Sequence, residues 1–93
     1  MRFVWDPEKA ERNRSKHGVT FDEAVTVFFD PLAVTFEDAE HSFEEPRLIT
    51  IGYSTDQRLL LVSHTEQSDT IRIISARQAT PRERKRHESQ ENK

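Results

Sequence analysis

The alternation of apolar and polar positions at the start of the chain predicts a short strand followed by a helix. Arg2–Trp5 combines aromatic and β-branched residues, as strands commonly do. Asp6 and Pro7 are residue types preferred at a helix N-cap and at the first helical position. His17 is followed by Gly18, the residue type that most often ends a helix. We therefore expect a helix over residues 7–17.

A second helix is predicted directly afterwards. Thr20 and Glu23 have the spacing of a capping box, in which each side chain can bond the backbone N–H group of the other residue. Apolar residues then recur at spacings of three and four, which indicates a core-facing stripe formed by Phe21, Ala24, Val25 and Phe28. We expect Asp30–Pro31 to end this helix, because the residue before proline avoids helical geometry.

Strands dominate the second half of the chain. Four segments rich in β-branched and other apolar residues are predicted strands: 32–36, 47–53, 58–65 and 70–77. Short polar turns separate the last three, which predicts antiparallel hairpins. Thr80–Glu83 is a second capping box and begins a final helix. No apolar residue follows Pro81, so we expect this helix to bury no stripe and to fray toward its end.

Helices grouped before a run of hairpins are typical of an α+β fold, with helices on one face of a mostly antiparallel sheet. A length of 93 residues fits a single domain, 1–93. The chain contains no cysteine, which excludes disulfides and cysteine-ligated metals. Its longest aliphatic run, Leu59–Val62, is too short to cross a membrane, and no signal-peptide pattern opens the chain. We therefore expect a cytoplasmic protein with no membrane partner.

The net charge of −3 argues against an indiscriminate nucleic-acid binder, but the charge is distributed unevenly. Residues 1–18 carry five basic and three acidic side chains, residues 19–71 carry two and eleven, and residues 72–93 carry seven and three. The two ends are therefore basic and the middle is acidic. If the fold brings the ends together, they can still form a basic surface.

Several segments resemble the BrnT family of bacterial toxins, in the same order along the chain. The strongest is Ile71–Thr80, which is close to the closing signature of that family. The other matching segments are Phe3–Asp6, Asn13 with Lys16–Val19, Phe28–Pro31, Glu45–Arg47, Ile51–Gly52 and Arg58–Leu60. Two positions depart from the family pattern: Gln67 stands where a basic residue is expected, and His87–Glu88 where an aromatic residue is expected.

This resemblance implies a RelE-like fold and a toxin of a type II toxin–antitoxin system. It further implies an endoribonuclease that cleaves RNA without a metal or another cofactor and so inhibits translation and growth. The implied partner is a ribbon-helix-helix antitoxin similar to BrnA, bound in a complex with two copies of each protein. We expect no sequence-specific DNA binding by the toxin without its antitoxin.

Arginines near strand ends are the candidates for binding RNA. RNA cleavage by the ribose 2′-hydroxyl needs a base, an acid and positive charge beside the crowded phosphate. Arginine suits the last role, because its planar fork matches phosphate oxygens and is always charged. We select Arg77 and Arg58 for this charge, with Arg47 assisting.

The competing interpretation is that these arginines form structural ion pairs. Strand alternation places Arg77 on the same face as Ile71, Ile73 and Ser75, at the rim of a covered face. Each arginine could there be paired with a nearby carboxylate, such as Glu44, Glu45 or Glu66.

The end of the first helix supplies the remaining candidates. Lys16 and His17 could transfer a proton or position a phosphate, and a histidine titrates near neutral pH. The inward stripe of this helix, Ala10, Asn13 and His17, is unusually polar for a helix that packs on a sheet. The alternative is a satisfied buried Asn13–His17 pair, with a favourable cation at the end of the helix.

Other charged groups have structural interpretations. His64 fits a cross-strand packing role, and the acidic segment 37–45 lacks the spacing and turn glycine of a calcium loop. The basic cluster within 82–86 could contact RNA, but we favour a solvated helix with an Arg84–Glu88 pair. Two rival functions follow from the same residues: a non-catalytic RNA-binding domain, or a protein-interaction module that docks through its acidic middle.

Overall fold

The computed structural model describes residues 1–41 and 45–91. Its five strands are β1 (Arg2–Val4), β2 (Val34–Glu37), β3 (Leu48–Tyr53), β4 (Leu59–Gln67) and β5 (Thr70–Gln78). Its helices are α1 (Pro7–His17), α2 (Phe21–Val27), the short 3₁₀ helix η1 (Ala39–His41) and α3 (Pro81–Glu91). None of the helices in these residues has the length and apolar character that a membrane crossing requires.

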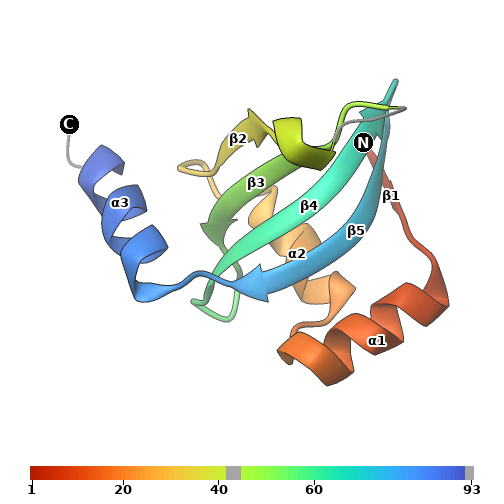
Figure 1. The fold of residues 1–93 in the computed structure, drawn as a ribbon, viewed down its shortest axis with the longest axis horizontal. Coiled ribbons are helices and arrows are strands. Elements are labelled where there is room, and N and C mark those ends of the chain that lie inside the picture. Colours follow the sequence, from red (N-terminus) through yellow and green to blue (C-terminus); the bar gives the residue numbers. More distant parts are fainter. Residues whose placement is uncertain (42–44, 92–93) are drawn as a thin grey trace.

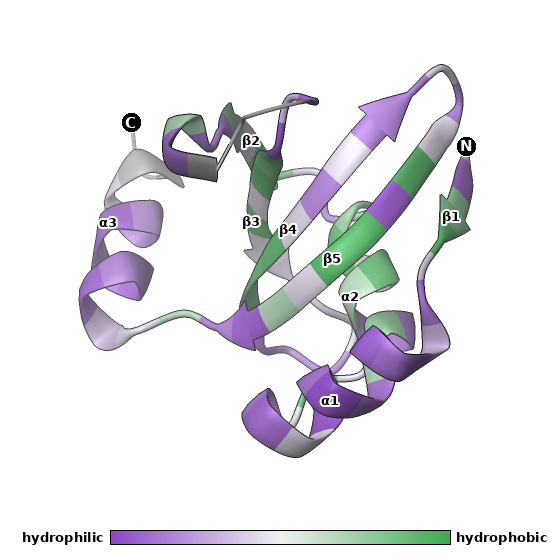
Figure 2. Ribbon diagram, turned by 45° about the vertical axis from the view of Figure 1, so that its right-hand side comes forward, coloured by the Kyte–Doolittle hydropathy of each residue, from purple (hydrophilic) through white to green (hydrophobic). Residues whose placement is uncertain are grey.

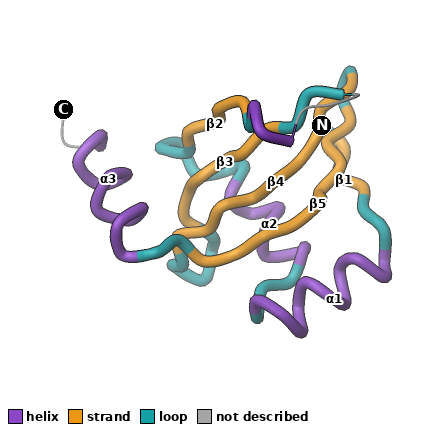
Figure 3. The backbone as a smooth tube through the Cα atoms, viewed as in Figure 1, coloured by secondary structure: helices purple, strands orange, loops and turns teal. Residues whose placement is uncertain are grey.

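The strands form one sheet in the order β1-β5-β4-β3-β2 (Figure 1). Strands β2 to β5 are antiparallel to their neighbours, whereas β1 runs parallel to β5. β1 pairs only with Thr70–Arg72, so the later part of β5 forms an edge of the sheet within the described residues. Figure 3 shows α1 below this part of β5, with α3 at the other end of the molecule.

Helices α1 and α2 cover one face of the sheet and enclose the core between helices and strands. The buried core residues are Val19, Phe21, Ala24, Val27, Leu60, Val62, Ile71, Ile73 and Ala76. Figure 2 shows hydrophobic colour in the strands and α2, whereas α1 and α3 are mainly hydrophilic. The predicted α+β fold, with its first two helices on one face of a mostly antiparallel sheet, is confirmed.

Local signals placed the two ends of α1 correctly. The Asp6 side chain accepts a hydrogen bond from the backbone N–H of Glu8 at 2.9 Å, and Pro7 begins the helix. Gly18 follows His17 in the left-handed conformation, with φ of 68°, which a residue without a Cβ adopts at little cost.

The predicted stripe and end of α2 need correction. Val27 is fully buried, whereas the predicted Val25 is only partly buried. The α-helix ends at Val27, because the next three N–H groups, up to Asp30, bond to carbonyls three residues back and not four. Asp30 lies in the turn that follows. Its carboxylate accepts hydrogen bonds from the backbone N–H groups of Leu32 at 3.0 Å and Tyr53 at 2.7 Å, and so fastens the turn to β3.

A β-bulge in β5 reverses the side-chain alternation along that strand. The register pairs Ser63 with Ser75 and His64 with Ile73. Ile74 is therefore an extra residue, and the residues after it change face. Ile73 points toward the helices and is buried, whereas Ser75 and Arg77 point to the opposite face. The prediction that Arg77 shares a face with Ile71 and Ile73 is therefore wrong.

The last helix, α3, begins at the predicted residue, and it buries the side chain of His87. Glu83 accepts a hydrogen bond from the Thr80 N–H at 2.9 Å, and the Thr80 hydroxyl accepts one from the Glu83 N–H at 3.2 Å. His87 is only 2% exposed and lies beside the ring of Tyr53, with 6.1 Å between ring centres. Glu88 accepts a hydrogen bond from the Tyr53 hydroxyl at 3.4 Å, instead of forming the predicted pair with Arg84.

His64 has the packing role predicted for it. Its side chain is fully buried, with its ring edge-on to Phe28 at 4.9 Å between centres. Its Nε2 atom shares a hydrogen bond of 2.7 Å with the Thr50 hydroxyl. Burial lowers the pKa of His64 to about 4, so the ring is neutral at pH 7.

Candidate functional site

A hollow lies on the face of the sheet away from α2, and it extends to the edge formed by β5. Two of the five candidate residues, His17 and Arg77, line it. It has a volume of about 260 Å³ and is lined by His17, Ile49, Leu61, Ser63, Ser75, Ala76 and Arg77. Ser63 and Ser75 lie directly opposite each other on β4 and β5. The β-bulge is what turns Ser75 and Arg77 to this face. The fold therefore brings a guanidinium, an imidazole and two hydroxyl groups to one place.

Arg77 is held at this hollow by a carboxylate from α3. Its two terminal nitrogens, Nη1 and Nη2, donate to the two oxygens of Glu83 at 2.8 and 2.9 Å. Nη1 also donates to the backbone carbonyl of Gln78 at 3.2 Å. The hydrogen bonds between the two side chains are the main reason that the pKa of Glu83 is lowered to about 2 and that the pKa of Arg77 is raised. Both groups are therefore charged at neutral pH.

His17 reaches the hollow from the last turn of α1, and Asn13 fixes that helix against β5. The Asn13 side chain is buried, and its amide nitrogen donates to the carbonyls of Val19 at 3.0 Å and Ala76 at 2.8 Å. Its oxygen accepts from the Ala76 N–H at 3.0 Å. The suggested Asn13–His17 pair is therefore replaced by bonds from Asn13 to the backbone of Val19 and of Ala76 in the sheet. Ala76 directly precedes Arg77, so one buried amide positions both His17 and Arg77.

Arg58 does not line this hollow. Its guanidinium forms a salt bridge with Glu23 of α2 and donates a hydrogen bond to the carbonyl of Gly18 at 3.0 Å. The Ser54 hydroxyl donates to the same Glu23 carboxylate at 2.7 Å. The hydrogen bond from Arg58 is the main reason that the pKa of Glu23 is lowered. The contact ties the end of α1 and the start of α2 to the beginning of β4.

This use of Glu23 also corrects the first predicted capping box. The Thr20 hydroxyl accepts a hydrogen bond from the Glu23 N–H at 3.0 Å, as expected. The Glu23 carboxylate does not return the bond to Thr20 and binds Arg58 and Ser54 instead. One half of the box is therefore present.

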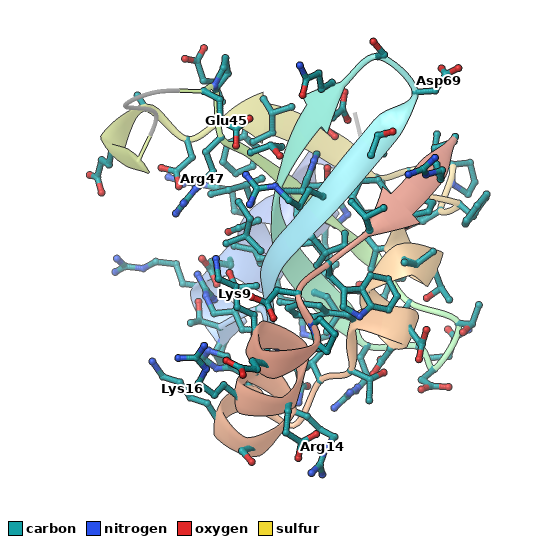
Figure 4. All side chains as sticks on the ribbon, turned by 90° about the vertical axis from the view of Figure 1, so that its right-hand side faces the viewer. Lys9, Arg14, Lys16, Glu45, Arg47 and Asp69 are labelled. Carbon is teal, nitrogen blue, oxygen red and sulfur yellow. The ribbon has the colours of Figure 1, made fainter. Side chains whose placement is uncertain are left out.

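Lys16 and Arg47 lie outside the residues that line the hollow. Figure 4 shows both on the same side of the molecule, with Lys16 at the end of α1 and Arg47 in the segment before β3. Lys16 is exposed, and Arg47 is partly buried, with its backbone carbonyl bonded to the Asp38 N–H at 2.8 Å. A fourth arginine, Arg72, forms a salt bridge with Glu45 farther along β5.

Sequence reasoning missed most of the residues around Arg77. Ser75 lies on the face of Arg77, as strand alternation predicted, but Ser63 carried no signal, because its position opposite Ser75 depends on the bulge. Glu83 was recognised as part of a capping box, but its pairing with Arg77 was not foreseen. No cluster of three or more His, Asp or Glu side chains suited to a metal occurs in residues 1–41 and 45–91. The predicted solvated acidic loop lies partly outside these residues, as does Glu44, one of the suggested arginine partners.

Comparison with known proteins identifies the family. The model of the family described as "Ribonuclease toxin, BrnT, of type II toxin-antitoxin system" matches residues 5–83. The chain belongs to the BrnT family. A search of curated proteins gave no match. Among solved structures, the chain is similar to the Brucella abortus ribonuclease toxin BrnT, with a TM-score of 0.66 and 25% sequence identity. The match covers 86% of this chain and 97% of the Brucella chain.

Membership of the BrnT family gives the chain a biological role. It is a toxin of a type II toxin–antitoxin system, and the resemblance found in its sequence is confirmed. Toxins of such systems are neutralised by an antitoxin protein, so this BrnT-family chain has a protein partner. The family description also makes RNA its class of substrate.

Proposed function

We propose that this BrnT-family toxin is an endoribonuclease that cuts RNA at the hollow beside β5, without a metal ion. The observation that carries the proposal is that Arg77 and His17 line one hollow in a chain of a ribonuclease-toxin family. These two candidates for RNA chemistry come from distant parts of the sequence, and both line the same hollow. Such cleavage would inhibit translation and growth, and we place it in the cytoplasm, where messenger RNA is translated.

In the proposed reaction, the ribose 2′-hydroxyl attacks the adjacent phosphorus and the bond to the 5′-oxygen breaks. The attacking hydroxyl gives up a proton, and the departing oxygen gains one. His17 is our candidate for one of these proton transfers. Arg77 stabilises the extra negative charge on the phosphate oxygens in the transition state. The hydroxyls of Ser63 and Ser75 can donate hydrogen bonds to the same oxygens.

The other candidates take supporting roles in this proposal. Lys16 and Arg47 lie on one side of the molecule and suit contacts with neighbouring phosphates of the RNA chain (Figure 4). Arg58 is engaged by Glu23 and Gly18, which supports a scaffold role in place of direct contact with the reacting phosphate.

RNA cleavage by the purified toxin is expected to continue in excess EDTA. Arginine and hydrogen-bond donors supply the charge stabilisation that a divalent ion would otherwise provide. The measurement is the cleavage rate of a labelled single-stranded RNA after dialysis against EDTA, with a magnesium-dependent nuclease as the positive control for chelation. Activity that disappears in EDTA and returns with magnesium would contradict the metal-independent mechanism.

We further propose that the antitoxin is a ribbon-helix-helix protein similar to BrnA, bound in a complex of two toxins and two antitoxins. Ribbon-helix-helix proteins are dimers, so each subunit can carry one toxin copy. Co-expression with such a protein encoded beside the toxin gene should restore growth, and the two proteins should elute together from a sizing column. Light scattering of that peak gives the stoichiometry. Separate elution of the two proteins would contradict the proposed partner.

A further inference from the structure

A second hollow lies on the open face of the sheet, next to the first. It has a volume of about 410 Å³ and is lined by Val34, Phe36, Ile51, Leu61, Glu83, Arg86 and His87. Leu61 lines both hollows, and Glu83 at the second is bonded to Arg77 at the first. Helix α3 therefore borders the proposed RNA site, and Glu83 is its point of contact with Arg77.

The Glu83 carboxylate occupies the part of Arg77 that a phosphate would use. Arginine binds carboxylate and phosphate alike through two parallel N–H···O bonds from its planar fork. In the structure, Nη1 and Nη2 of Arg77 both donate to the Glu83 oxygens. A substrate phosphate that binds Arg77 in the same way must first displace this carboxylate.

The structure leaves room for such displacement. The pair is partly exposed, with 41% of the Arg77 side chain and 31% of the Glu83 side chain accessible, so a phosphate can reach the guanidinium and water can hydrate the carboxylate once it leaves. Helix α3 has no apolar residue after Pro81, and His87 is its one buried side chain within 81–89. The bond from the Glu83 N–H to the Thr80 hydroxyl and the packing of His87 do not involve the Glu83 carboxylate, so the start of the helix keeps support when the carboxylate moves. The Thr80 N–H shares the Glu83 oxygen Oε1 with Arg77.

We propose that Glu83 is an internal competitor of RNA: it occupies the Arg77 guanidinium in the free toxin and is displaced by the substrate phosphate. The inference rests on the proposed contact between Arg77 and RNA. Through Glu83, helix α3 then limits the access of RNA to Arg77 in the proposed active site. The parent toxin then binds RNA more weakly than it would if Glu83 did not compete with the phosphate for Arg77.

The test compares RNA binding by the parent, Glu83→Gln and Glu45→Gln. Glutamine keeps the capping box, because it can still accept the Thr80 N–H bond, and it removes the charge that holds Arg77. Glu45→Gln is the matched control, since it makes the same change of charge and releases Arg72 on the same strand. The probe is a short mixed-sequence RNA with 2′-O-methyl groups throughout, which cannot be cleaved by 2′-hydroxyl attack.

Glu83→Gln is expected to bind this RNA about three- to fivefold more tightly than Glu45→Gln does, the size expected for loss of a partly exposed pair. Adding Arg77→Ala should weaken binding more in the Glu83→Gln protein than in the parent, because only there is Arg77 unrestrained. Far-UV circular dichroism and melting temperature confirm that each variant folds.

The outcomes separate this inference from the proposed function. If the parent binds and cleaves RNA but Glu83→Gln binds no more tightly than Glu45→Gln, the competitor role is wrong. A fall in cleavage rate of Glu83→Gln at unchanged affinity also contradicts it and makes Glu83 a positioning residue for Arg77. If the parent neither binds nor cleaves RNA, the proposed function fails and the inference fails with it.

Discussion

Replacing Arg77 with alanine is expected to slow RNA cleavage by on the order of 10²–10³, the size found when one donor to a transition-state charge is removed. Arg77→Lys should recover only part of this loss, because an ammonium group keeps the charge but lacks the planar fork. RNA affinity should fall much less than the cleavage rate. Arg77 makes its strongest contact in the transition state, and in the ground state RNA must first displace Glu83.

Arg72→Ala provides a matched control for this prediction. Arg72 lies on the same strand and also forms a partly exposed salt bridge, with Glu45, but it does not line the hollow with His17. We expect Arg72→Ala to lose at most about 1 kcal/mol of stability, as is usual for exposed pairs, and Arg77→Ala to lose more, because its pair with Glu83 is bidentate and less exposed. A cleavage rate per folded Arg77→Ala molecule that stays close to that of Arg72→Ala would show that Arg77 is a scaffold residue.

Replacing Asn13 with alanine is expected to lower the free energy of unfolding by about 3 kcal/mol. The change removes three buried hydrogen bonds and leaves the Val19 carbonyl and both backbone groups of Ala76 without their partner. The surviving folded protein should also cleave RNA more slowly, because the same amide sets the position of His17 relative to Arg77. Urea unfolding followed by fluorescence of Trp5 measures the loss of stability.

Two further variants sharpen the test of Asn13. Asn13→Asp keeps the shape and the acceptor oxygen, but places a second oxygen against the carbonyls of Val19 and Ala76, so it should destabilise at least as much. Ser15→Ala changes an exposed residue of the same helix and should alter stability by no more than about 0.5 kcal/mol. A loss below about 1 kcal/mol for Asn13→Ala would show that its hydrogen bonds do not hold α1 against β5.

The elements predicted well from sequence are those that local chemistry determines. Asp6, Pro7 and Gly18 bound α1 because capping groups and a left-handed glycine act within one turn of the chain. Thr80 and Glu83 mark the start of α3 for the same reason. The polar inward stripe of α1 correctly indicated that Asn13 is a buried, bonded residue.

The features that were not predicted depend on contacts between distant segments. The bulge at Ile74 has no local signature, yet it decides which face Arg77 occupies. Arg58 and Glu23 are far apart in the sequence, so a salt bridge between them could not be inferred from either helix or strand pattern. His87 is buried by the arrangement of α3 beside Tyr53, although its own helix has no apolar stripe.

The proposed chemistry is attack of the ribose 2′-hydroxyl on the adjacent phosphorus at the site of Arg77. The most direct test uses an RNA whose main cleavage site has been mapped, and an identical RNA with a single 2′-deoxyribose on the 5′ side of that site. The first RNA should be cleaved and should carry a 2′,3′-cyclic phosphate, and the second should not be cleaved at that position. Equal cleavage of both RNAs at that position would contradict the proposed chemistry.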